Sequence, residues 1–154
     1  MADKDVTVVL DEAGIEYEVL PHPRTETAAA EAEALGIGTG EVAKTLVIST
    51  PGGYVRAVVQ ASDRIDLRKL RDHVEGGKRI HLASEEDLER DYPGFELGAV
   101  PPFGGSGDQV LVDVRLAEHE SVVLEAGSHE QSVRMRTTDL LELTGADVAD
   151  LAQD

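Results

Sequence analysis

The spacing of apolar residues along this chain switches repeatedly between the two-residue period of a strand and the longer period of a helix. Alternating or β-branched runs predict strands at 15–21, 41–50, 54–61, 79–83, 109–116, 121–127 and 132–136. Helical spacing with capping residues predicts helices at 4–13, 27–36, 66–74, 84–91 and 138–145. Several links between strands are too short for a crossover helix. We therefore predict an α+β fold with a mixed, largely antiparallel central sheet and helices packed around it.

The clearest local signal is a hairpin. Pro-Gly-Gly at 51–53 separates two runs rich in valine, and a tight turn of this kind joins antiparallel strands. Two helix starts also carry capping residues: Ser84 with Asp87 resembles a capping box, and Thr138 is expected to cap the last helix. No repeat, linker or low-complexity block interrupts the pattern, so residues 1–154 are expected to form a single domain.

Composition narrows the class of protein. Hydrophobic residues make up 41% of the chain, which argues against disorder. There is no cysteine, and this excludes disulfides, a thiol nucleophile and a thiolate metal site. The sequence opens with charges mixed among apolar residues and has no apolar run of membrane-spanning length. We expect a cytoplasmic protein with no membrane partner.

The charge is strongly acidic and unevenly spread. The chain has 31 Asp and Glu residues against 14 Lys and Arg residues, for a net charge of −17. This speaks against bulk attraction to nucleic acid, because phosphate contacts depend on cationic side chains. Residues 64–79 are nevertheless basic on balance, and such a local face could bind a polyanion. An ordinary solvated helix surface is the alternative.

Lys44 is the first candidate for chemistry. If Leu46 and Ile48 point into the core, the two-residue period of a strand places Lys44 on the same face. A lysine in an apolar row sits at a rim or has a partner. At the rim of a pocket it would be a fixed cation for a phosphate, carboxylate or carbonyl oxygen. The alternative is a lysine whose amino group simply reaches solvent at the strand end.

His129 follows a predicted strand in a Gly-Ser turn, AGSHEQ. A histidine there can donate or accept a hydrogen bond near neutral pH and can orient a substrate or a water molecule. An ordinary loop histidine is the alternative. The other histidines lack the spacing of metal ligands and no HExxH motif occurs, so neither a metal nor any other cofactor is expected.

The segment 98–104, GAVPPFG, combines stiffness with exposed backbone. Its prolines fix the chain on one side, whereas Gly98 and Gly104 leave backbone amides unshielded by side chains. Amides on a rigid loop suit an oxyanion or a ligand carbonyl. A stiff connector is the alternative.

Taken together, several motifs resemble the YbaK family of aminoacyl-tRNA deacylases, which is related to the editing insertion domain of bacterial prolyl-tRNA synthetases. The order and spacing of the motifs match from about residue 15 to residue 151. The segments that carry the resemblance are VAKTLV (42–47), GGYVRAVV (52–59), SEEDLE (84–89), GAVPPFG (98–104), AGSHEQSVRM (126–135) and DLLELTGADVADL (139–151).

The resemblance implies hydrolysis of the ester between a wrong amino acid and the 3′ end of a tRNA, typically tRNA for proline. Family substrates include alanine and cysteine, and the family fold is a single α+β domain. The implied partner is the 3′ end of an aminoacyl-tRNA, with prolyl-tRNA synthetase as a candidate second partner and no DNA. The alternative is a non-catalytic module that binds a nucleotide, an aminoacyl ligand or a protein partner.

The implied catalytic residues are Lys44, Gly98 and His129. Because an aminoacyl ester is already activated, the protein needs only to hold the carbonyl, stabilise the oxyanion and admit water. The implied substrate-binding residues are His22, Thr25, Thr45, Leu46, Val100, Pro101, Pro102, Phe103, Gly127 and Ser128. For the tRNA backbone, the basic stretch 64–79 supplies the candidate contacts, which are Arg64, Arg68, Lys69 and Arg71.

Overall fold

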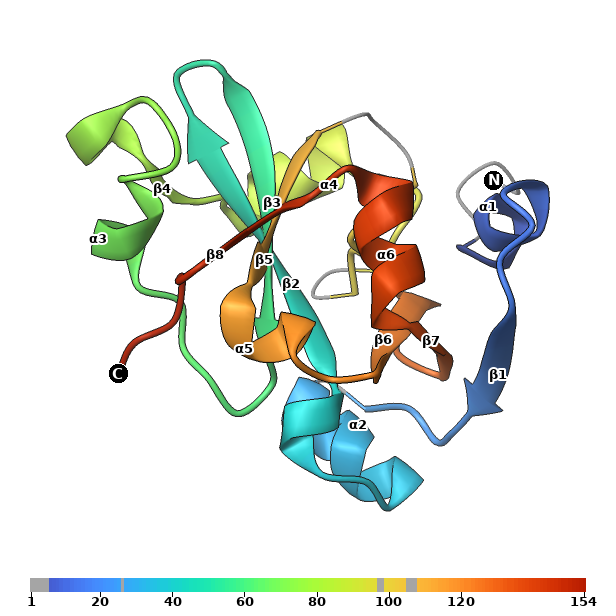
Figure 1. The fold of residues 1–154 in the computed structure, drawn as a ribbon. Helices are drawn as coiled ribbons and strands as arrows, with labels where there is room; N and C mark the ends of the chain where they lie inside the picture. Colours follow the sequence, from blue (N-terminus) through green and yellow to red (C-terminus); the bar gives the residue numbers. More distant parts are fainter. Residues whose placement is uncertain (1–5, 26, 97–98, 105–107) are drawn as a thin grey trace.

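The computed structural model describes residues 6–25, 27–96, 99–104 and 108–154, and it contains two sheets (Figure 1). The three-stranded sheet has the order β1-β7-β6 and the five-stranded sheet the order β4-β2-β3-β5-β8. The strands are β1 (Tyr17–Pro21), β2 (Ala43–Thr50), β3 (Gly53–Gln60), β4 (His81–Leu82), β5 (Gln109–Asp113), β6 (Ser121–Ser128), β7 (Gln131–Arg136) and β8 (Asp147–Ala149).

Most strand pairs are antiparallel. β2 and β3 form the predicted hairpin, with Ala43 opposite Gln60 and Thr50 opposite Gly53. β7 pairs antiparallel with both β1 and β6, whereas β5 runs parallel to β3 and β8. The expectation of a mixed, largely antiparallel α+β fold is therefore confirmed. The prediction of one central sheet missed its division into two.

Short helices surround the sheets: α1 (Val6–Glu12), α2 (Ala28–Leu35), α3 (Leu67–Leu70), α4 (Glu85–Asp91), α5 (Val114–Ala117) and α6 (Thr137–Thr144), with 3-10 turns η2 (Thr39–Glu41) and η3 (Gly77–Arg79). The hydroxyl of Thr27 accepts the Ala30 amide at 3.0 Å and so caps α2 as predicted. Ser84 and Asp87 form a reciprocal capping box at α4, which confirms that prediction. Among the described residues, no helix is long and apolar enough to cross a membrane.

Several predicted boundaries are wrong. The helix predicted at 66–74 ends at Leu70, and the strand predicted at 79–83 is confined to His81–Leu82.

Two further boundaries have a clear structural reason. Thr138 does not cap α6, because β7 runs directly into the helix and Thr137 is already its first residue. The strand predicted at 109–116 ends at Asp113, where the Asp113 carboxylate accepts the Arg115 amide at 3.0 Å and starts α5. In both places a side chain or a tertiary contact overrides the local strand or capping signal.

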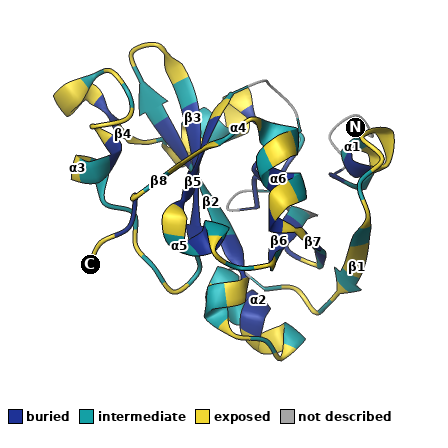
Figure 2. Ribbon diagram, in the orientation of Figure 1, coloured by how far each residue is buried: buried dark blue, intermediate teal, exposed yellow. Residues whose placement is uncertain are grey.

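The five-stranded sheet is buried on both faces. Val110 and Val112 of β5 point into a core shared with β6, β7, α1 and α6, whereas Leu111 points into a second core with α3. This follows from the two-residue period, which sends successive side chains to opposite faces. Figure 2 accordingly shows β3 and β5, at the centre of the molecule, in the buried colour.

The two sheets meet along β2 and β6. Within the described residues, one backbone bridge joins them, between Val42 and Val123, and both side chains are buried against Ala32 of α2. Beyond this bridge β4 covers only Ile48 and Ser49 of β2. The first half of β2 therefore presents an edge toward β6, and the candidate site lies beside this edge.

Candidate active site between the two sheets

A pocket of about 240 Å³ opens beside the uncovered edge of β2. This volume is below the roughly 300–1,000 Å³ usual for sites that hold drug-sized ligands, so the pocket suits a small group. Its lining comes from β2, β6, the start of α2 and the segment 99–101, and it comprises Thr27, Ala28, Ala43, Lys44, Thr45, Leu46, Ala99, Val100, Pro101, Leu124 and Glu125.

Lys44 stands at the rim of this pocket. It pairs with Val59 in the hairpin, on the same face of β2 as Leu46, as the two-residue period predicted. Its Nζ donates to the carbonyl oxygen of Ala61 at 3.4 Å, close to the end of β3. Burial lowers the pKa of Lys44, while Asp63 opposes this shift and Arg64 adds to it. The lysine is thus half-buried and held at one position.

Glu125 brings a carboxylate to the opposite wall. It is buried, and its Oε2 lies 2.9 Å from Nδ1 of the buried His129. His129 is not part of the pocket lining and stands behind Glu125. The register of β6 shifts between Glu125 and Ser128, in the stretch that also holds Gly127, just before the turn that carries His129. His129 therefore contacts Glu125, and Glu125 in turn lines the pocket.

Hydrogen bonds fix the backbone of His129 on both sides. Its amide donates to Oε2 of Glu96 at 2.6 Å, and its carbonyl accepts the Thr25 amide at 2.9 Å. The other carboxylate oxygen of Glu96 pairs with Arg24 at 3.0 Å. The bond from the His129 amide lowers the pKa of Glu96, and the Arg24 contact lowers it further. Three segments distant in sequence are joined in this way.

A second polar group lies behind the pocket wall. His22 Nε2 is 2.9 Å from the hydroxyl of Ser132, which also hydrogen-bonds to the fully buried Glu31. Burial raises the pKa of Glu31 to about 7, against the opposing effect of the Ser132 bond. Ser132 stands directly opposite Glu125 in the β6–β7 pair. His22 and Thr25 thus support the wall from behind.

The proline segment divides between two environments. Val100 and Pro101 line the pocket, as Thr45 and Leu46 do on the other side. Phe103 instead packs in the core between the sheets, and Pro102 lies with it at a separate hollow. Gly98 lies outside the described residues. The structure thus brings together only part of the segment that the sequence predicted as one wall.

The backbone amides of the segment 99–104 differ in whether they donate a hydrogen bond within the protein. That of Ala99 donates to the carbonyl of Glu96 at 3.0 Å. No hydrogen bond from the Val100 amide to another described residue is found, and prolines follow it. The Val100 amide is therefore a candidate donor to a ligand, because Val100 lines the pocket.

Arg56 fixes the far side of the segment. Its guanidinium donates to the carbonyls of Pro101 and Gly104, each at 2.8 Å, and to Asp108 at 3.1 Å. The same group lies 5.1 Å from the ring centre of Tyr92, within the range of a cation–π contact. Arg56 thus connects β3 to the pocket wall.

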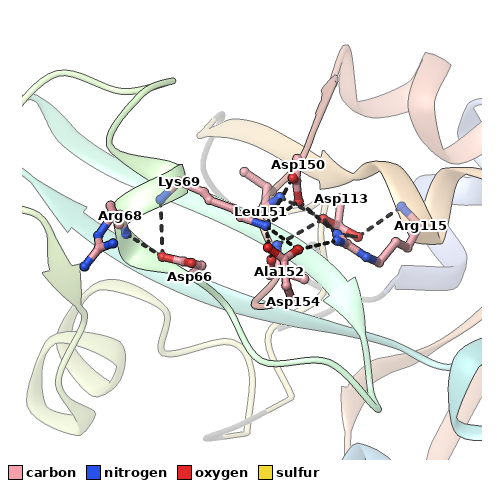
Figure 3. Close-up of polar contacts among 9 residues, drawn as sticks. All are labelled: Asp66, Arg68, Lys69, Asp113, Arg115, Asp150, Leu151, Ala152 and Asp154. Atoms are coloured by element: carbon pink, nitrogen blue, oxygen red, sulfur yellow. Dashed lines mark hydrogen bonds and ion pairs between the residues drawn. The ribbon is translucent and has the colours of Figure 1, made fainter.

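The predicted tRNA-backbone residues fall into two groups. Arg64, Arg68 and Arg71 are exposed, and in Figure 3 the Arg68 side chain points away from the neighbouring acids. Lys69 differs, because its Nζ pairs with Asp150 at 3.1 Å and with Asp154 at 3.0 Å. The positive charge of Lys69 is therefore already balanced within the chain.

Three hollows adjoin along this side of β2. A small apolar hollow of about 170 Å³ shares Thr45, Leu46 and Val100 with the first pocket and extends to Leu82. Leu82 also borders an open groove of about 650 Å³ that Arg68 and Arg71 line. A path of shared lining residues thus leads from the pocket to the exposed arginines.

Several site residues were missed from the sequence. Glu125, Glu31 and Arg56 each interrupt an apolar or alanine-rich run, and this is the signal that singled out Lys44. Ser132 gave no such signal. Over the described ranges, no group of three or more His, Asp or Glu side chains is arranged to hold a metal ion.

Comparison with known proteins agrees with this geometry. Residues 22–143 match the family model described as the aminoacyl-tRNA editing domain. The chain is 30% identical over 141 residues to the Multifunctional Ser/Thr-tRNA deacylase ProXp-y of Escherichia coli (strain K12), covering 88% of this chain and 83% of that protein. It is 27% identical over 105 residues to the Proline–tRNA ligase of Thermosipho melanesiensis, covering 68% of this chain and 18% of the ligase.

Solved structures share the fold. A proposed trans-editing enzyme for prolyl tRNA synthetase superposes with a TM-score of 0.87 at 30% identity, covering 97% of this chain and 95% of that one. The hypothetical protein APE2540 gives a TM-score of 0.87 at 25% identity, with 96% and 99% covered. The chain therefore belongs to the aminoacyl-tRNA editing family, as its YbaK-like motifs predicted, and it is a hydrolase of aminoacyl-tRNA esters.

Proposed function

We propose that this chain is a trans-acting deacylase that removes a small amino acid, such as alanine or cysteine, from mischarged tRNA for proline. The observation that carries the proposal is the small pocket between the sheets, with Lys44 on one wall and Val100 on the other. The E. coli relative is named for serine and threonine, which are also small. These four amino acids form the panel to test.

The proposed chemistry needs no covalent nucleophile. An aminoacyl ester is activated already, so water can attack once the carbonyl is held and the developing oxyanion is stabilised. The Val100 amide is a candidate donor for that oxyanion, and Gly98 remains a predicted one. Lys44 supplies positive charge for the oxyanion or for the phosphate of the terminal adenosine.

His129 acts in this scheme as a positioning residue. It stands behind Glu125, and both its amide and its carbonyl are held by neighbouring segments. A group in this position can orient a carboxylate, whereas a general base must reach the attacking water. We therefore assign His129 the task of fixing Glu125.

The tRNA end would follow the adjoining hollows. The apolar hollow between Leu46 and Leu82 offers a face for the terminal base, and Arg68 and Arg71 border the groove beyond it. Arginine side chains without acidic partners can contact phosphates. With a net charge of −17 few such contacts are expected, so a prolyl-tRNA synthetase that holds the tRNA is a candidate partner.

Deacylation assays test the proposal. tRNA for proline charged with alanine, cysteine, serine or threonine is incubated with the protein, and correctly charged prolyl-tRNA serves as the control. Lys44→Ala should lower the rate by about 100-fold, a typical loss for a group that stabilises an oxyanion. Lys78→Ala, which removes an exposed lysine, is the matched control.

Two outcomes would contradict the proposal. Absence of turnover on every mischarged tRNA of the panel would refute the substrate assignment. A folded Lys44→Ala variant with the wild-type rate would remove Lys44 from the mechanism.

A further inference from the structure

We infer that Glu125 binds the α-ammonium group of the aminoacyl ester, so that the pocket selects esters with a free amino group. This inference rests on the proposed function and names the part of the substrate that one wall recognises. It makes N-acylated esters, including peptidyl esters, poorer substrates than esters with a free amino group.

The charges of the pocket lining support this assignment. Among the residues that line the pocket, Lys44 and Glu125 are the ones with ionisable side chains, and they come from different sheets. An aminoacyl ester has a similar polarity, because its α-amino group is protonated at and below neutral pH, its carbonyl oxygen has a partial negative charge and the adjoining phosphate is negative. Glu125 would contact the α-ammonium group, and Lys44 would contact the carbonyl oxygen or the phosphate.

A carboxylate at the buried position of Glu125 needs a polar partner nearby. A buried carboxylate without partners is costly, whereas one that is paired and hydrogen-bonded is tolerated. His129 Nδ1 lies 2.9 Å from Glu125 Oε2. A carboxylate has two oxygens and about four lone-pair sites, so it can lie beside the His129 ring and still accept from an ammonium group.

The position of this carboxylate is set before any ligand arrives. Glu96 and Thr25 hold the backbone of His129 from two sides, and Ser132 stands opposite Glu125 on β7. A binding group supported in this way loses little freedom when its ligand arrives. The same support would make the pocket intolerant of a neutral, bulkier N-acyl group at this position.

The test compares two substrates on three proteins. Alanyl-tRNA for proline and its N-acetylated form are assayed with wild type, Glu125→Gln and Glu118→Gln. The last variant removes an exposed carboxylate shortly before β6 and is the matched control. Wild type and the control should prefer the free amino group by about 10- to 100-fold in kcat/KM, the usual range for a hydrogen bond to a charged group. Glu125→Gln should lose most of this preference, chiefly through KM.

Two results would overturn the inference. The first is equal hydrolysis of both substrates by the wild-type protein, and this result does not depend on whether the variants fold. The second is a Glu125→Gln variant that loses the same factor on both substrates, because a purely structural role predicts that pattern.

A binding measurement separates this inference from the proposed function. A non-hydrolysable amide, 3′-alanylamino-3′-deoxyadenosine, is titrated into each protein beside its N-acetyl form. Preference for the free amine in wild type and its loss in Glu125→Gln would support the subsite even if no tRNA of the panel were hydrolysed. Equal binding of the two forms to wild type would refute it even if deacylation were rapid.

Discussion

Charged side chains hold two regions of this molecule, and the regions differ in exposure. Beside the pocket, Arg56 is only 1% exposed and binds the carbonyls of Pro101 and Gly104. At the C-terminal edge, Arg115 is 33% exposed and pairs with Asp154, which is 85% exposed. Water can replace a lost partner at the edge but not beside the pocket. Similar ion pairs should therefore contribute very differently to stability.

The C-terminal region itself contains one buried group. Asp113 is fully buried and accepts the amides of Leu151 at 2.8 Å and Ala152 at 3.2 Å. Around it, Figure 3 shows Lys69 and Arg115 reaching the outer acids from opposite sides of the terminal segment. The contrast between buried and exposed charge can thus be tested within one cluster as well as between regions.

The largest effect is expected for Arg56→Ala. The substitution leaves two loop carbonyls and Asp108 without their buried cation, and losing one member of a buried charged network costs about 3–5 kcal/mol. Denaturant unfolding measures the change in the free energy of unfolding. Arg90→Ala, at an exposed arginine, is the control and should change it little.

Arg56→Lys covers the case in which Arg56→Ala does not fold. A lysine keeps the charge but cannot span both carbonyls, so this variant should be destabilised less and should still deacylate more slowly. Full stability and full activity in Arg56→Lys would show that the buried region is no more sensitive than the exposed one.

The next effect is a pH dependence from Glu31. Its pKa rises from 4.5 to about 7 on folding, so the folded state keeps a proton that the unfolded state releases. The stabilisation from this proton is complete below about pH 4.5 and is lost as the pH rises toward 7. One pKa unit corresponds to about 1.4 kcal/mol, so the loss is about 3 kcal/mol.

Glu31→Gln removes this titration. The variant should match wild type at pH 4 and exceed its free energy of unfolding by up to about 3 kcal/mol at pH 8. Glu33→Gln, on the exposed side of the same helix, should follow the wild-type curve. Parallel curves for wild type and Glu31→Gln would mean that folding does not change the pKa of Glu31.

A smaller effect is expected for Asp113→Ala. Two buried amides lose their acceptor, at a cost of about 2 kcal/mol, and the terminal segment should loosen. Hydrogen exchange at Leu151 and Ala152 measures this directly and should become faster. Unchanged exchange would mean that the buried Asp113 contributes no more to local stability than the exposed ion pairs around it.

The smallest effect on stability is expected when Asp150 and Asp154 are both replaced by asparagine. Both pairs are exposed and screened by salt, so the melting temperature should change less than in any variant above. The substitution removes the acidic partners of Lys69, however, and two of those of Arg115. tRNA binding at low salt should therefore strengthen, with a salt dependence steeper by about one counterion for each cation that then contacts a phosphate. Unchanged tRNA binding would exclude Lys69 from the nucleic-acid surface.

Local features of the fold were predictable from the sequence, and long-range ones were not. The hairpin and the caps at Thr27 and Ser84 depend on residues close in the chain. The second strand neighbour of β5 was missed, because β8 has only three residues and depends on parallel pairing with Asp113 and its neighbours. The arrangement of the two sheets likewise depends on contacts between distant segments, such as the bridge between Val42 and Val123.

The same limit applies to the site. Lys44 could be predicted as a site residue because a charge in an apolar strand violates the two-residue pattern. His129 was predicted from the family resemblance. Glu125 violates the pattern equally, but its importance depends on β6 lying across from β2, which periodicity cannot reveal. Phe103 was predicted to line the pocket because its neighbours in sequence do, but it packs in the core between the sheets.

The bridge between Val42 and Val123 has a consequence for how relatives diverge. Because this is the backbone link between the sheets in the described residues, the width of the gap in front of it depends on the side chains packed behind it, including Ala32. A methyl group gained or lost there would tilt one sheet against the other. Evolution could therefore retune the size of the accepted amino acid from the rear, leaving every group that meets the substrate untouched.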